Sequence, residues 1–146
     1  MRVQDQVVLA LCIWRENRGH GREGMQSVAN VILNRAAKDG STAYAEVVKP
    51  LQFSSMTAKG DPELALWPAD NDQSWDAALD IAELAAAGVL QDITNGALLY
   101  YAPHALDPTK TKPYTWLDGS TIPFPETWNA NVVKPLCSIG GQVFFR

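Results

Sequence analysis

The feature that most constrains the fold is a pair of long amphipathic patterns at the start of the chain. Apolar residues recur at helical spacing from Val3 to Trp14, and Gly19 is a natural helix stop. A second helical pattern runs from about Arg22 to Lys38 and ends at Gly40. Helices of this length bury their apolar faces against one another or against later segments. The first part of the chain is therefore predicted to form a helical core.

Two shorter helices and a loop are expected next. Residues 42–48 form a short helical pattern that closes before Pro50. Residues 51–69 are polar, irregular and marked by glycine and proline, which is typical of a functional loop. Asp70 with Gln73 resembles a capping box, and the helical pattern that follows ends at Gly88.

The hydrophobic period then changes from helical to extended. Asn95-Gly96 predicts a turn, and residues 97–101 form a short apolar run suited to a strand. A proline-rich stretch from Pro103 to Pro125 shows no helical period, and residues 136–145 predict a hairpin around Gly140-Gly141. The predicted fold class is α+β: one mainly helical domain, residues 1–146, with a small antiparallel β-sheet in its C-terminal half.

Composition narrows the range of partners. The 146 residues suffice for one core, and a net charge of −4 argues against a nucleic-acid backbone as a partner. Glu16 and Arg18 interrupt the first apolar run, so neither a signal peptide nor a membrane span is predicted, and synthesis in the cytoplasm is expected. Cys12 and Cys137 are expected to stay reduced. No cofactor is expected, and no metal-ligand spacing is present.

Glu16 is the side chain that points most directly to chemistry. It is the last acid on an otherwise apolar helix and lies close to Trp14, so it is expected where that helix leaves the core. Burial disfavours the charged form of a carboxyl group and raises its pKa. A carboxylic acid that keeps its proton near neutral pH is what cleavage of a glycosidic bond requires. Glu16 is therefore the candidate general acid.

Four blocks of sequence carry a family resemblance. The first is Glu16-Asn17-Arg18-Gly19 with the run from Glu23 to Arg35, and the second is Gln52-Phe53-Ser54. The third is Thr94-Asn95-Gly96-Ala97-Leu98, and the fourth is the closing hairpin with Ile139-Gly140 and Val143-Phe144. In this order they resemble the SleB-like cell wall hydrolases, a family of spore-cortex-lytic enzymes, wall-remodelling enzymes and phage lysins. Because the blocks span nearly the whole chain, the resemblance is specific.

The resemblance implies a lysozyme-like or lytic-transglycosylase-like fold and cleavage of the β-1,4 bond between N-acetylmuramic acid and N-acetylglucosamine in peptidoglycan. Glu16 would protonate the leaving oxygen and then accept a proton from the muramyl C6 hydroxyl, which closes an anhydro ring. An internal nucleophile removes the need for the second carboxylate of ordinary glycosidases. The sequence offers no obvious partner acid, although Asp61 and Asp92 are available to lie across the cleft.

Some positions depart from the family pattern or carry structural roles. The family usually has a small residue before the first glutamate and a second glutamate four residues after it, where this chain has Arg15 and His20. Arg15 can alter the pKa of Glu16. Glu23 is expected to stabilise the start of its helix through the helix dipole, and Arg35 to brace a buried acid such as Glu23.

The residues expected to contact the glycan are Gln52, Ser54, Asn95, Tyr101 and Trp116. Amide and hydroxyl groups suit the acetamido and hydroxyl groups of the sugars, although Asn95 has a competing role as a turn residue. Tyr100 and Tyr101 point to opposite faces of a strand, and Tyr101 is assigned to the cleft. The flat indole of Trp116 is expected to stack on a sugar ring.

A wall amidase or peptidase needs a metal cluster or a cysteine–histidine pair, and only His20 and His104 are present. A muramidase-type hydrolase of the same bond and a non-catalytic glycan-binding module remain alternatives. The favoured biological role is a monomeric phage or prophage endolysin that acts on the cell wall after release through a holin pore.

Overall fold

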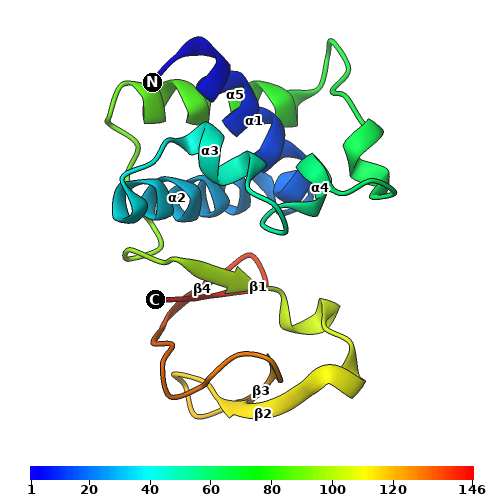
Figure 1. Cartoon of the computed structure of the whole chain (residues 1–146), viewed down its shortest axis with the longest axis vertical. Helices are drawn as coiled ribbons and strands as arrows, with labels where there is room; N and C mark the ends of the chain where they lie inside the picture. The colour runs from blue at the N-terminus through cyan, green and yellow to red at the C-terminus, as the bar shows by residue number, and fades with distance from the viewer.

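The computed structural model describes all 146 residues as two stacked parts, one helical and one of sheets (Figure 1). The helical part contains α1 (Val3–Asn17), α2 (Gly21–Asp39), α3 (Ala43–Val48), α4 (Ser54–Thr57) and α5 (Gln73–Ala86), with the 3₁₀ turns η1 (Arg18–His20) and η2 (Pro62–Ala65). The sheet part contains β1 (Leu99–Tyr101), η3 (Pro103–Ala105), η4 (Pro108–Lys110), β2 (Thr111–Thr115), β3 (Thr121–Pro125), β4 (Pro135–Ile139) and β5 (Gln142–Phe145). None of the helices has the length and apolar character needed to span a membrane. The α+β prediction is confirmed.

The helical core is built around α1. Its residues from Leu9 to Trp14 are all buried, and the helix packs against α2, α3 and α5. The indole N–H of Trp14 donates to Asp72 Oδ2 at 2.9 Å, and Asp72 Oδ1 accepts from the backbone of Ser74 and Trp75. Asp72 is therefore the N-cap of α5, and the predicted start at Asp70 was two residues early.

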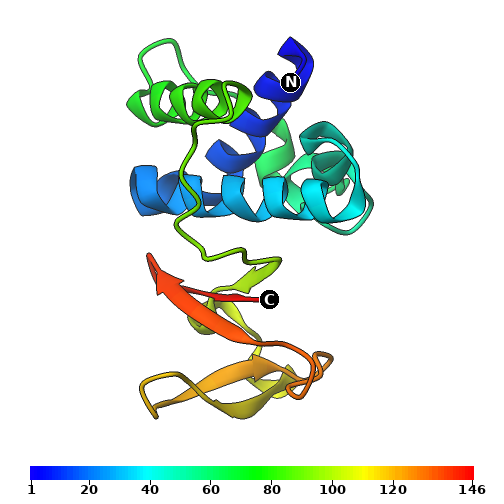
Figure 2. The same ribbon diagram turned by 90° about the vertical axis from the view of Figure 1, so that its left-hand side faces the viewer.

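The three-stranded sheet lies between α2 and a second hairpin (Figure 2). Its strand order is β1-β5-β4, antiparallel throughout, and all four residues of the central strand β5 are buried. Phe144 packs toward α2 with Val31, whereas Val143 and Phe145 face the β2–β3 hairpin. The predicted closing hairpin is confirmed, and the φ values of Gly140 and Gly141, 57° and 77°, are those that a tight hairpin turn needs.

The stretch from Pro103 to Pro125, expected to be irregular, contains the β2–β3 hairpin. The sequence hid this hairpin because proline is depleted in strands. Here Pro113 lies directly opposite Pro123 in a two-stranded sheet, so neither proline interrupts a longer ladder. Phe124 from this hairpin is fully buried against the three-stranded sheet. The sheet part therefore has an aromatic core of its own.

Candidate active site

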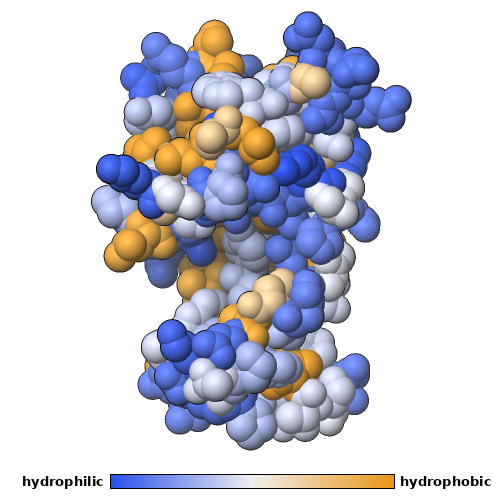
Figure 3. All heavy atoms as spheres, turned by 90° about the vertical axis from the view of Figure 1, so that its right-hand side faces the viewer, coloured by the Kyte–Doolittle hydropathy of each residue, from blue (hydrophilic) through white to orange (hydrophobic).

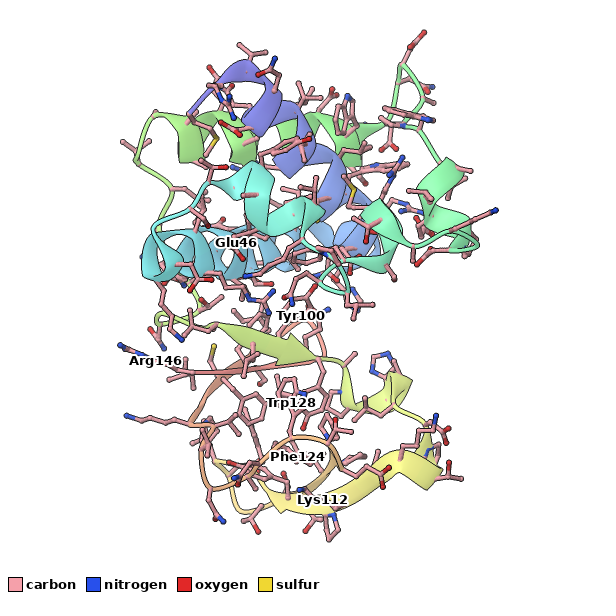
Figure 4. All side chains as sticks on the ribbon, viewed as in Figure 1. Glu46, Tyr100, Lys112, Phe124, Trp128 and Arg146 are labelled. Atoms are coloured by element: carbon pink, nitrogen blue, oxygen red, sulfur yellow. The ribbon has the colours of Figure 1, made fainter.

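The last turn of α1 presents polar side chains where the helical part meets the sheet. Arg15 and Asn17 are buried, and Glu16 is half-buried. Figure 4 shows Tyr100 of β1 at this junction, pointing toward the helices. Figure 3 shows that the molecule narrows at the same level. A helix whose buried residues from Leu9 to Trp14 are all apolar thus places an acid at the boundary between the two parts.

The Glu16 carboxyl group lies between the 51–69 loop and the sheet. Ser55 Oγ donates a hydrogen bond to Glu16 Oε1 at 2.5 Å, and the Tyr100 hydroxyl lies 3.5 Å from Oε2. Burial is the largest influence and raises the pKa of Glu16; the charges of Asp61 and Glu63 raise it further, while both hydroxyl groups lower it. The net shift is upward, so Glu16 keeps its proton to a higher pH than a solvated glutamate.

Arg15 of α1 and Arg18 of η1 bind the 51–69 loop beside Glu16. Arg15 Nη1 donates to Ser55 O at 3.0 Å, and its Nε and Nη2 donate to Leu66 O at 3.1 and 2.9 Å. Arg18 forms a two-pronged ion pair with Glu63, with distances of 2.6 and 3.1 Å. Arg15, which occupies the family's small-residue position, therefore orders the segment that carries Ser55.

Asp61 is the second carboxylate near Glu16. It is half-buried, and it accepts hydrogen bonds from Ser54 Oγ at 2.6 Å and from the Glu63 backbone at 2.9 Å. The first of these contributes most to lowering the pKa of Asp61, so this group is ionised where Glu16 is still protonated. Asp92 instead accepts hydrogen bonds within its own turn, residues 92–96. No group of three or more metal-ligating side chains is present.

Ser55→Ala should move the alkaline limb of the pH–activity profile to higher pH. The Ser55 hydroxyl stabilises the ionised form of Glu16, so its removal raises the pKa of an acid that must be protonated to act. The measurement is kcat/KM against pH for both proteins. Ser54→Ala is the matched control, because that hydroxyl binds Asp61. A limb that moves to lower pH in Ser55→Ala would contradict this assignment.

Asn17 joins the end of α1 to both α2 and the sheet. Its Nδ2 donates to Gly24 O at 2.7 Å and to Gln142 Oε1, at the start of β5, at 2.9 Å. A Cβ atom at position 24 would lie 2.5 Å from His20 Cβ and 2.9 Å from Asn17 Nδ2, so only glycine fits there. These contacts fix the distance between α1 and the sheet, and with it the approach of Tyr100 to Glu16.

Arg35 does not brace Glu23, contrary to the expectation from the sequence. Its Nε donates to Leu98 O at 2.6 Å and its Nη1 to Gln52 Oε1 at 2.9 Å. Glu23 is exposed in the first turn of α2, twelve residues or about 18 Å of helix away. Arg35 therefore ties Gln52 to the start of the sheet.

The assignment of Tyr101 to the cleft was wrong. Tyr101 is 8% exposed, its hydroxyl donates to Pro123 O at 2.9 Å, and its ring stacks on Phe145. The neighbouring Tyr100 points to the opposite face of β1 and reaches Glu16. The predicted alternation of faces was correct, but the face that each tyrosine occupies depends on how β1 pairs with β5, which the sequence does not reveal.

The other predicted contact residues lie in different places. Trp116 packs edge-on against Phe145 and belongs to the aromatic core of the sheet part, which argues against its predicted stacking role. Asn95 is exposed in the tight turn before β1, with a φ of 58°. Sequence reasoning did not single out Trp67, which is 71% exposed and lies 5.3 Å from the Arg15 guanidinium. Trp67 is thus an exposed aromatic residue on the 51–69 loop, beside Arg15.

Comparison with known proteins agrees with this architecture. Residues 19–145 match the sequence model of the family described as Cell Wall Hydrolase. The chain belongs to this family. Glu16 lies three residues before the matched segment, so its assignment rests on the contacts described above. A search of curated protein sequences finds no match.

Two solved structures share the fold of this cell wall hydrolase family member. One is the catalytic domain of the germination-specific lytic transglycosylase SleB from Bacillus anthracis, with a TM-score of 0.68 and 22% identity over 100% of this chain and 97% of that one. The other is the catalytic domain of the Bacillus cereus SleB protein, with a TM-score of 0.63 and 22% identity over 100% and 93%. The predicted SleB-like architecture is confirmed.

Proposed function

We propose that this protein is a peptidoglycan lytic transglycosylase whose residues 1–146 act as one catalytic domain with Glu16 as general acid and base. The observation that carries the proposal is the half-buried Glu16 with a raised pKa, bound by Ser55 and close to Tyr100. Membership of the Cell Wall Hydrolase family and the fold shared with a lytic transglycosylase support the choice of substrate.

The proposed reaction cleaves the β-1,4 bond between N-acetylmuramic acid and N-acetylglucosamine. Protonated Glu16 gives its proton to the glycosidic oxygen as the bond to the muramyl C1 breaks. The Glu16 carboxylate then takes the proton of the muramyl C6 hydroxyl as that oxygen bonds to C1. Because the nucleophile belongs to the substrate, one carboxyl group serves both steps. The Ser55 hydrogen bond holds the carboxyl group in place and stabilises its ionised state.

The products released from purified sacculi test this reaction. We expect glycan fragments that end in 1,6-anhydromuramyl residues, which borohydride does not reduce. Mass analysis of the muropeptides before and after borohydride treatment distinguishes them from reducible ends. Fragments with mainly reducible muramic ends would rule out the transglycosylase and leave a hydrolase.

A muramidase-type hydrolase is the second candidate, and the position of Asp61 favours it. A hydrolase needs a carboxylate that activates water or attacks C1, and Asp61 is an ionised carboxylate close enough to raise the pKa of Glu16. Asp61→Asn separates the two mechanisms. A hydrolase that uses Asp61 loses about 10²–10⁴-fold in kcat, whereas a transglycosylase keeps most of its activity.

Substrate contacts are proposed around Glu16. Gln52 and Ser54 lie in the segment that carries Ser55, and both side chains are exposed. Trp67 adds an exposed indole on the same loop, suited to stacking on a pyranose ring. Asn95, in the turn before β1, stays a predicted contact. A non-catalytic glycan-binding module would share these contacts, and loss of lysis in Glu16→Gln separates the enzyme from it.

Release of the protein through a holin pore, as in a phage lysin, and a monomeric state both stay predictions. Lysis of a bacterial host on expression with a holin, and its absence without one, would support the first. Light scattering of the purified protein measures the second.

A further inference from the structure

A cavity of about 610 Å³ opens where α2 and α3 meet the edge of the sheet. Arg35, Lys38 and Lys49 line it from the helical side, and Arg146 with Leu99 and Val132 line it from the sheet side. An adjoining cavity of about 220 Å³ shares Lys38 and Arg146 with it. Figure 4 shows Glu46, a further lining residue, above this junction and Arg146 below it.

The cavity carries an excess of positive charge in an acidic protein. Four of the chain's 12 lysines and arginines line it against two carboxylates, Asp39 and Glu46, although the net charge of the chain is −4. Lys49 is neutralised, since it lies 3.4 Å from an Asp39 oxygen and 3.8 Å from a Glu46 oxygen. Lys38 and Arg146 form no ion pair, and Arg35 donates only to a backbone carbonyl and an amide. Three cations therefore face this space without a carboxylate partner, which suits an anionic ligand.

The cavity is lined by residues from two segments that also contact Glu16. Gln52 lines the cavity and lies three residues before Ser55, which binds the Glu16 carboxyl group. Leu99 lines it and directly precedes Tyr100, whose hydroxyl reaches Glu16. A glycan whose scissile bond lies at Glu16 would thus place its side branches within reach of the cations.

We propose that this cavity binds the peptide branch that peptidoglycan carries on its muramic acid residues; this inference rests on the proposed function. Where a peptide is attached, the carboxyl group of the muramic acid is amide-bonded, so the sugars are neutral and the free carboxylates belong to the peptides. Those carboxylates would lie against Lys38 and Arg146, and alanine methyl groups against Leu99 and Val132. An extended tetrapeptide spans about 14 Å, so its charged end lies well away from the sugar. Inorganic phosphate has no apolar group that could contact Leu99 and Val132.

The test compares glycan strands that bear peptides with the same strands after an amidase has removed the peptides. The variant is Lys38→Gln combined with Arg146→Gln, and Lys110→Gln, on η4 outside the cavity, is the matched control. We expect the wild type to prefer the peptide-bearing strands. The double variant should lose about tenfold of that preference, as the ratio of kcat/KM values, mainly through KM. The control should keep the wild-type ratio.

Binding measurements test the cavity independently of catalysis. Calorimetry with Glu16→Gln measures the affinity for a soluble acidic stem tetrapeptide and for inorganic phosphate, with and without the two cavity substitutions. Tetrapeptide binding that the substitutions abolish supports the inference. The inference is overturned if the wild type cleaves both kinds of strand equally, or if a folded double variant keeps the wild-type ratio of kcat/KM values. It is also overturned if phosphate binds more tightly than the tetrapeptide. If neither kind of strand is cleaved, the proposed function fails. Tetrapeptide binding then still tests whether the cavity binds a peptide.

Discussion

Glu16→Gln should lower kcat for sacculus lysis by about 10³–10⁴-fold without unfolding the protein, because no other group supplies the proton and later accepts one. The amide keeps the size of the side chain, and its oxygen can still accept the Ser55 hydrogen bond. Burial already disfavours a charge at this position, so a neutral amide adds no desolvation cost there. Turbidity loss of purified sacculi gives the rate, and a thermal melt verifies the fold.

Glu23→Gln is the matched control for that experiment. Glu23 is exposed in the first turn of α2, where a carboxylate interacts favourably with the helix dipole. Its substitution should therefore leave lysis near the wild-type rate. If Glu16→Gln retains lysis while Glu23→Gln loses it, the acid has been assigned to the wrong residue.

The helices and the acid could be predicted because both depend on local pattern. The apolar period of α1 stops at Arg15 and Glu16, so an acid at the edge of the core follows from the sequence alone. Ser55 and Tyr100 could not be predicted in the same way. Ser55 lies one residue beyond the Gln-Phe-Ser block, and the loop that carries it is positioned by Arg15 from 40 residues away.

Several residues of the family-like motifs have structural roles in this fold. Asn34 Nδ2 donates to Asp92 Oδ2 and to Ala97 O, which holds the turn before β1 against α2. Gly24 makes room for Asn17, and Thr94 Oγ1 donates to Asp92. These positions join the helical part to the sheet. Residues of a motif around a catalytic acid can therefore be required for the contacts that position the acid, and not only for the reaction.

Phe145→Ala should destabilise the protein by about 3–5 kcal/mol, the usual cost of truncating a fully buried phenylalanine. The ring is fully buried at the centre of the sheet part's aromatic core. It stacks on Tyr101 at 5.7 Å and meets Trp116 and Trp128 edge-on at 5.5 and 5.8 Å. Small domains have total stabilities of about 5–15 kcal/mol, so the loss is a large fraction of the whole. Urea unfolding measures it.

Leu117→Ala, at a residue 59% exposed beyond β2, is the control and should change stability by less than about 0.5 kcal/mol. Phe145 faces away from Glu16, because its neighbour Phe144 is the residue that stacks on Tyr100. Phe145→Ala should therefore keep the wild-type kcat and KM at a temperature where it is fully folded. A raised KM in the folded variant would instead show that the aromatic core takes part in binding the glycan, as the sequence alone suggested for Tyr101 and Trp116.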